Sequence, residues 1–310
     1  MDASPMLTAR RRSAAGMTLI ELLVAMTVAG IILGLIVMIS VRQQRVIADV
    51  ADATALGTQL RDAEAVLSID LRAVSPSAGD IRAGEARDTS IEFRGVIASA
   101  VVCDTSRGRL ILAPAATGST TYASYLTTIQ AGDTAWLLDA SDSASDWLPH
   151  AVLSVASAVA GRCAAVAPAL DSASSKVARV GIAIDSAPTS SAIGRPLRVT
   201  RPLRYSIYRG ADGDWYLGQR DWNPGTARFN SIQPVSGPFL PPALGGMVFR
   251  YLDSAGRALS TPVGDTRSIA LVQVDLRGQS KNSERAFGAA PPAAHHADST
   301  SIVVRLHNRE

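Results

Sequence analysis

The chain has 310 residues, of which 47% are hydrophobic and 18% are charged. This composition is too apolar for a disordered protein, and one membrane segment would explain only part of it, so we expect a buried core elsewhere in the chain. The formal net charge is +3, and residues 1–16, with three arginines and one aspartate, supply +2 of it. The rest of the chain is therefore nearly neutral, which argues against a broad nucleic-acid interface.

The N-terminal region consists of a short basic leader followed by a long apolar run. From Met17 to Val41 there is one charged residue, Glu21, and the run is long enough for about 37 Å of helix. The cluster Arg10-Arg11-Arg12 indicates that the N-terminus stays in the cytoplasm and that the rest of the chain is exported. The small residues Ala14-Ala15-Gly16 precede the apolar run, so a cut after Gly16 would remove the leader and keep the helix, unlike cleavage of an ordinary secretory signal.

The segment Gly16-Met17-Thr18-Leu19-Ile20-Glu21-Leu22 resembles the class III signal of type IV prepilins and of type II secretion pseudopilins. The resemblance implies that a membrane prepilin peptidase cuts after Gly16 and N-methylates the new first residue, Met17. A methionine stands where phenylalanine is commoner in that family. The alternative is a plain single-pass anchor that contains one stray glutamate.

Glu21 is the costly residue of this segment, because an ionisable group at the centre of a bilayer costs roughly 2.5 kcal/mol or more. It lies four residues after Met17, so both residues share one helix face. Its carboxylate can neutralise the amine of its own chain or that of a neighbour, and the resemblance implies the neighbour, which makes Glu21 an assembly contact. Gly30-x-x-x-Gly34 is either a close-packing face or the ordinary glycine content of a membrane helix.

The helix is expected to continue beyond the membrane. Apolar residues recur every three or four positions from Val46 to Val74, before Pro76 and Gly79 end the pattern. The sequence thus predicts four parts: a cleaved leader (1–16), a membrane and filament-core helix (17–41), an amphipathic continuation (42–75) and a β-rich head (76–310).

The head shows short β-like runs separated by Gly, Ser, Asp and Pro, which together with the long helix predicts an α+β, pilin-like fold with an antiparallel sheet. The clearest hairpin joins Leu203–Tyr208 to Asp214–Leu217 through Asp212-Gly213. Residues 278–298 contain few apolar side chains and are expected to form a mobile loop.

The two cysteines, Cys103 and Cys163, both lie in the part expected to be exported. A disulfide between them is favoured over two buried free thiols, because it suits an oxidising compartment. It would close a loop of about 60 residues and contribute on the order of 4 kcal/mol.

A second resemblance concerns the head, which is similar to those of PilW-like minor pilins and J-type minor pseudopilins. It is carried by Phe249–Gly256, by Val274–Arg277 and by the terminal Leu306-His307-Asn308. It favours a minor subunit over a major one.

No catalytic constellation stands out, and we predict neither an enzyme nor a cofactor nor a metal site. The pair His295-His296 is more simply a solvated part of a loop than a metal ligand set, and His150 and His307 stand alone. Trp215, Tyr216 and Trp222 suit a sugar or a partner, but core and cross-strand packing is the stronger interpretation.

The sequence therefore predicts a minor pilin that assembles or initiates a type IV pilus-like filament. A minor pseudopilin of a type II secretion system is the alternative, and an adhesin or enzyme on a pilin-like stem is a third, less favoured one. The expected partners are other pilins through the helix, the prepilin peptidase, the inner-membrane assembly machinery and the lipid bilayer, with no nucleic acid. We expect a single-pass inner-membrane protein with its head in the periplasm or outside the cell, and a place in the filament after assembly.

Overall fold

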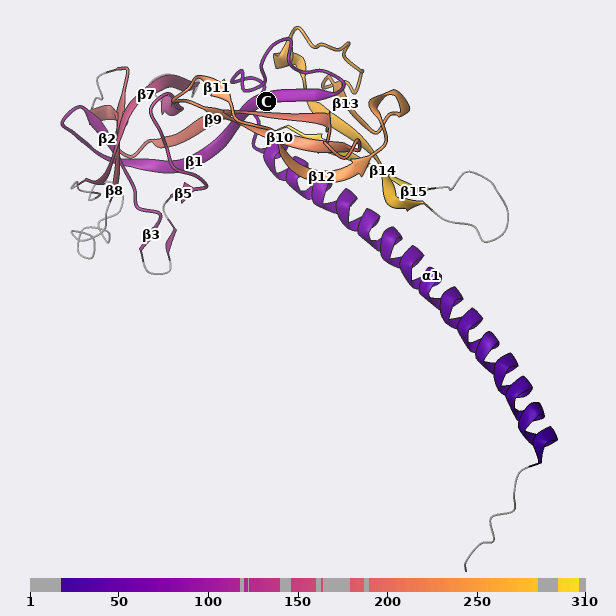
Figure 1. Ribbon diagram of the computed structural model, residues 1–310. Coiled ribbons are helices and arrows are strands. Elements are labelled where there is room, and N and C mark those ends of the chain that lie inside the picture. Colours follow the sequence, from indigo (N-terminus) through magenta and orange to yellow (C-terminus); the bar gives the residue numbers. More distant parts are fainter. Residues whose placement is uncertain are drawn as a thin grey trace, which may run out of the picture. The chain divides into compact units, whose positions relative to one another are not determined.

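The structure is a computed structural model (Figure 1), and it describes residues 18–117, 120–121, 123–139, 146–159, 163, 179–186, 190–283 and 295–306. The chain divides into two compact units, residues 1–52 and 53–310, and each is described by itself. One helix begins in the first unit and ends in the second.

The helix α1 (Leu19–Arg72) has 54 residues, which corresponds to about 81 Å of length. Figure 1 shows it as an uninterrupted ribbon, as expected for a stretch that contains no proline. It ends two residues before Val74, whose N–H still bonds to the Leu71 carbonyl oxygen. Among the described residues it is the one helix long and apolar enough to cross a membrane.

Within the second unit, α1 packs on the head through one stripe. Its buried side chains follow each other at spacings of three and four, which places them on a single helix face: Leu56, Leu60, Ala63, Leu67 and Leu71. Val46 and Val50, which the predicted stripe also includes, lie in the first unit and are 56% and 60% exposed in the isolated chain.

Two polar bonds fix this end of the helix to the sheet. The Tyr205 hydroxyl donates to Asp70 Oδ2 at 2.6 Å, and the Ser236 hydroxyl donates to the Gln59 carbonyl oxygen at 2.6 Å. Burial, the largest effect, and the charge of Asp221 raise the pKa of Asp70, while the Tyr205 hydroxyl acts in the opposite direction.

The head is built on antiparallel strands that pair in the order β13-β14-β12-β10-β9-β6-β7-β8-β2-β1-β5, with β11 beside β10 and β15 beside β14. Their bounds are β1 (Ser90–Ser106), β2 (Arg109–Leu112), β5 (Ser124–Tyr125), β6 (Thr134–Asp139), β7 (Asp146–Val159), β8 (Arg179–Ile184), β9 (Pro196–Arg209), β10 (Trp215–Asn223), β11 (Arg228–Phe229), β12 (Gln233–Phe239), β13 (Met247–Leu252), β14 (Leu271–Ser283) and β15 (His295–Arg305). A separate two-stranded sheet joins β3 (Ala116–Thr117) and β4 (Thr120–Thr121), and short 3₁₀ turns occupy Ser190–Ala192, Pro242–Leu244 and Thr266–Ser268.

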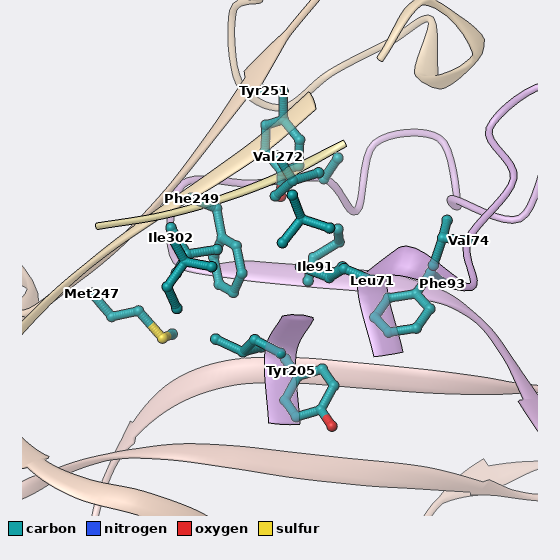
Figure 2. Close-up of a cluster of buried hydrophobic side chains, with 14 of the residues drawn as sticks. Leu71, Val74, Ile91, Phe93, Tyr205, Met247, Phe249, Tyr251, Val272 and Ile302 are labelled. Carbon is teal, nitrogen blue, oxygen red and sulfur yellow. The ribbon is translucent and has the colours of Figure 1, made fainter. Parts of the chain in front are cut away.

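The sheet encloses two hydrophobic cores. The first lies between α1 and the inner faces of β9, β10, β13, β14 and β15, and Figure 2 shows Leu71 among the side chains of Phe93, Tyr205 and Phe249. The second is built from the opposite ends of β1 and β9 together with β2, β6, β7 and β8. Because β1 and β9 pair from Ser90↔Ser206 to Val101↔Pro196, the same two strands take part in both cores.

The strands of the first core follow the two-residue repeat of a sheet with one buried face. In β13, Met247, Phe249 and Tyr251 are buried, while Val248 and Leu252 are half-buried and Arg250 is exposed. The α+β class, with one long helix followed by an antiparallel head, is thereby confirmed.

The predicted hairpin is present, since Tyr208 in β9 pairs with Tyr216 in β10 and Gly213 takes a φ of 91° in the turn. The loop predicted for 278–298 is wrong at both ends. Strand β14 runs to Ser283 and β15 starts at His295, and Gly278–Gln279 pair with Ala297–Asp298. The side chains at these strand ends are mainly polar. The alternation of apolar and polar residues that marks a strand is therefore absent there, although the backbones pair.

Candidate processing and assembly site

Thr18 and Glu21 form a closed hydrogen-bonded unit at the start of α1. The Thr18 backbone N–H donates to Glu21 Oε2 at 3.0 Å, and the Thr18 hydroxyl donates to the same oxygen at 3.1 Å. The Glu21 N–H in turn donates to the Thr18 hydroxyl oxygen at 3.4 Å. This reciprocal arrangement is a capping box, with Thr18 at the N-cap and Glu21 at the third helical position.

The capping box explains why the helix begins at this point. The first N–H groups of a helix have no partner inside it, and Thr18 and Glu21 supply two of the missing contacts. A carboxylate in the first turn also interacts favourably with the positive end of the helix dipole. The Thr-x-x-Glu spacing was visible in the sequence, but our sequence interpretation assigned Glu21 only to assembly.

Glu21 has a second oxygen, Oε1, which bonds to no group in the described part of the chain, whereas Oε2 accepts both bonds from Thr18. The capping box therefore leaves part of the carboxylate available to an additional donor. Gly16 and Met17 lie outside the described residues, so cleavage and methylation at this junction stay predictions.

The helix surface that follows is apolar and open. Large hydrophobic side chains from Leu19 to Val41 are all at least 39% exposed in the isolated chain. A Cβ added at Gly30 or at Gly34 would meet no atom within 4 Å, so a neighbouring helix has room to approach there. Such a surface suits lipid or the apolar faces of other helices.

The two cysteines are brought together in the head. Cys103 lies on β1, its Cα is 4.5 Å from that of Cys163, and both side chains are buried beside Ala113. The Cα separation falls in the range that a disulfide requires.

Among the described residues, His150 does not form part of a catalytic relay. His150 Nδ1 lies 3.2 Å from Asp185 Oδ1 and 3.1 Å from the Ser186 hydroxyl oxygen, so both groups contact the same ring nitrogen and no relay through the imidazole forms. The described residues include no group of three or more side chains that could hold a metal ion. The side chains of His295 and His296 and all of His307 lie outside the described part.

Two of the three candidate binding aromatics, Tyr216 and Trp222, pack against aromatic rings on neighbouring strands. Tyr208 and Tyr216 have ring centroids 6.0 Å apart, and Trp222 meets Phe229 edge-on at 5.2 Å. For Tyr216 and Trp222, these contacts are the cross-strand packing that the sequence predicts.

A family model matches the N-terminal part of the chain. Residues 11–37 match the prokaryotic N-terminal methylation motif, a span that includes Gly16, Met17 and the Thr18–Glu21 capping box. No curated protein and no solved structure matches the chain.

The motif is the signature of pilins and pseudopilins, and together with the long apolar helix it supports placing the chain in that class. It implies processing by a prepilin peptidase and assembly with other pilins. It also fits a protein anchored in the inner membrane and a pilin-type structural role for the N-terminal helix.

Proposed function

We propose that this protein is a minor pilin that assembles or initiates a type IV pilus-like filament. The observation that carries the proposal is the position of the methylation motif, which covers the junction where α1 begins. An extensive β-rich head with two cores supports a specialised subunit over a major one. The protein is inserted with its N-terminus in the cytoplasm and its head in the periplasm, in keeping with the basic residues at 10–12.

The proposed mechanism starts with cleavage after Gly16, which leaves a charged amine on Met17. In lipid this amine and the Glu21 carboxylate are each costly alone, so pairing them across neighbouring subunits favours lateral assembly. The capping box holds Oε2 of Glu21 at Thr18. We assign Oε1 of Glu21 as the acceptor of a hydrogen bond from the charged amine of the neighbouring subunit.

A minor pseudopilin of a type II secretion system is the alternative, because the methylation motif occurs in both classes of filament. The proposal is tested in the native host with a chromosomal deletion and a tagged full-length chain. We expect the deletion to reduce surface pili, and the tagged chain to occur in small amounts in the sheared-filament fraction, dependent on the prepilin peptidase.

Normal piliation with loss of protein secretion into the medium would instead identify a pseudopilin. Normal piliation and normal secretion, together with a loss of surface binding or of an enzymatic activity, would identify an anchored adhesin or enzyme.

A further inference from the structure

Strand β15 forms an outer edge of the head sheet. It pairs with β14 continuously from Leu271↔Arg305 to Gln279↔Ala297, and no other described strand pairs with it (Figure 1). The Leu306 N–H bonds to the Ala270 carbonyl oxygen at 3.1 Å, which fixes the alternation of the backbone groups. Residues 300, 302 and 304 therefore bond to β14, whereas Ser299, Ser301, Val303 and Arg305 direct their N–H and C=O groups away from the sheet.

The neighbouring edge strand is covered, which makes the open edge of β15 distinctive. On β13, the Phe249 N–H donates to the Asp88 carbonyl oxygen at 2.7 Å. The Tyr251 carbonyl oxygen accepts from the Leu259 N–H at 2.8 Å. The fold thus satisfies two outward backbone groups of β13 with its own chain. On β15 the Ser299 N–H donates to Asp298 Oδ1 at 2.8 Å, whereas the outward backbone groups of Ser301, Val303 and Arg305 have no partner among the described residues.

Between Asp298 and Arg305, the sequence of β15 lacks the features that normally protect an edge strand. Its stretch Ser299-Thr300-Ser301-Ile302-Val303-Val304 contains no proline and no charge, and it is rich in β-branched residues. Ile302 and Val304 are buried against the core, while Val303 on the opposite face is 60% exposed. Such a strand is well suited to pairing with another chain.

Next to this edge, the outer face of the sheet has a groove of about 660 Å³. Its lining includes Arg250, Asp275, Arg277 and Ser301, with the 59% exposed Leu244 at its margin. Asp275 Oδ2 lies 2.7 Å from Arg250 Nη1, and Asp275 Oδ1 accepts from the Ser301 hydroxyl at 2.7 Å. Two arginines against one carboxylate leave the groove positively charged.

We propose that the open edge of β15 binds an extended strand of a partner protein that places a carboxylate side chain over the groove, beside Arg277. Backbone hydrogen bonds at Ser301, Val303 and Arg305 hold the strand, and the groove selects its side chains, as in other cases of strand addition. The proposal holds for a partner inside or outside a filament, so it does not depend on the proposed function.

The test uses the full chain in detergent micelles and the peptide acetyl-Thr-Val-Glu-Val-Thr-Val-amide. Hydrogen–deuterium exchange by mass spectrometry should show slower exchange in the β15 fragment when the peptide is added at millimolar concentration. A peptide with Lys in place of Glu should bind about tenfold more weakly, because its charge repels the arginines.

Two protein variants locate the contact. Val303→Pro removes one outward N–H without removing a bond to β14, and it should abolish the protection, whereas Val303→Thr keeps that N–H and should bind like the parent chain. Arg277→Glu should reverse the preference, so that the Lys peptide binds better than the Glu peptide, and this result does not depend on the folding of the proline variant.

Any one of four results with the peptides or the free chain would overturn the proposal. They are the absence of protection by the peptide, equal binding of the two peptides, an unchanged peptide preference in Arg277→Glu, and full protection of β15 in the free chain, which would show that its own chain covers the edge. A concentration-dependent dimer that protects the same fragment would also overturn it, by making the occupant a second copy of this chain.

Discussion

Glu21 is positioned by its own helix, because Thr18 donates two hydrogen bonds to one of its carboxylate oxygens. A carboxylate that is already oriented loses less side-chain freedom when a neighbouring amine binds. At the scale of the residue, the account thus gives Glu21 two tasks, capping the helix and pairing with the next subunit.

Replacing Glu21 separates these tasks from processing. Glu21→Ala should leave cleavage after Gly16 largely intact and should strongly reduce incorporation into filaments, because the neighbour's amine then has no carboxylate to pair with. Immunoblots of the sheared-filament and membrane fractions would measure both effects. Glu64→Ala, at an exposed position of the same helix, is the matched control and should assemble normally. Normal incorporation of Glu21→Ala would refute the mechanism.

Asp70 gives a pH-dependent prediction. Burial is the main cause that raises the pKa of Asp70 in the folded head above the ordinary value of 3.8. Its contribution to stability is therefore fully present below pH 3.8 and is lost as the pH rises through the folded-state pKa. An asparagine does not titrate. The free energy of unfolding of Asp70→Asn, relative to that of the parent chain, should therefore increase as the pH rises from 3.8 through the folded-state pKa of Asp70.

Urea unfolding of the full chain in micelles, repeated from about pH 3 to pH 7, measures this difference. Tyr205→Phe should enlarge the loss of stability with rising pH, because it removes the hydroxyl that lowers the pKa of Asp70. A relative free energy of unfolding that stays constant across the pH range would contradict the account.

At the scale of the element, α1 docks on the head through its leucine stripe. Leu67 is fully buried, whereas Ile69, two residues later, is 68% exposed. Leu67→Ala should lower the free energy of unfolding of the head by about 3 kcal/mol, because it removes buried methyl groups and leaves a cavity. Ile69→Ala should change it by less than about 0.5 kcal/mol. Urea unfolding compares the two, and equal losses would show that the stripe does not carry the docking.

The elements differ in how well the sequence predicts them. The helix was predicted almost to its end and the hairpin of β9 and β10 was predicted correctly, because both have strong local signals in apolar periodicity and turn residues. The facing ends of β14 and β15 were not predicted. Their pairing depends on contacts between segments far apart in the sequence and involves polar side chains, so no local pattern marks it.

At the scale of the whole molecule, the cysteine pair ties β1 to a segment 60 residues away. We expect a disulfide, and peptide mapping without reductant should yield a linked fragment containing Cys103 and Cys163. Replacing both residues by serine should destabilise the head by about 4 kcal/mol on the chain-entropy model, and reductant should then have no additional effect. Labelling of both thiols by maleimide in the unreduced, urea-unfolded chain would contradict the pairing.

The candidate site was partly visible in the sequence. Glu21 and the apolar helix were identified from composition and resemblance, since a carboxylate inside an apolar run is conspicuous. The second task of Glu21, as part of a capping box with Thr18, was missed although its spacing is local. The open edge of β15 had no sequence signal of its own, because an edge is defined by which strands pair and not by the strand itself.

The proposed mechanism requires that the chain is cut after Gly16 and joins a filament through the new N-terminus. Mass spectrometry of the N-terminal peptide from the native host tests this most directly. The account predicts a peptide that begins with N-methylated Met17 and still contains Glu21, and it predicts an unprocessed chain when Gly16 is replaced by a bulky residue. A native chain that retains residues 1–16, or one cut beyond the apolar helix, would contradict it.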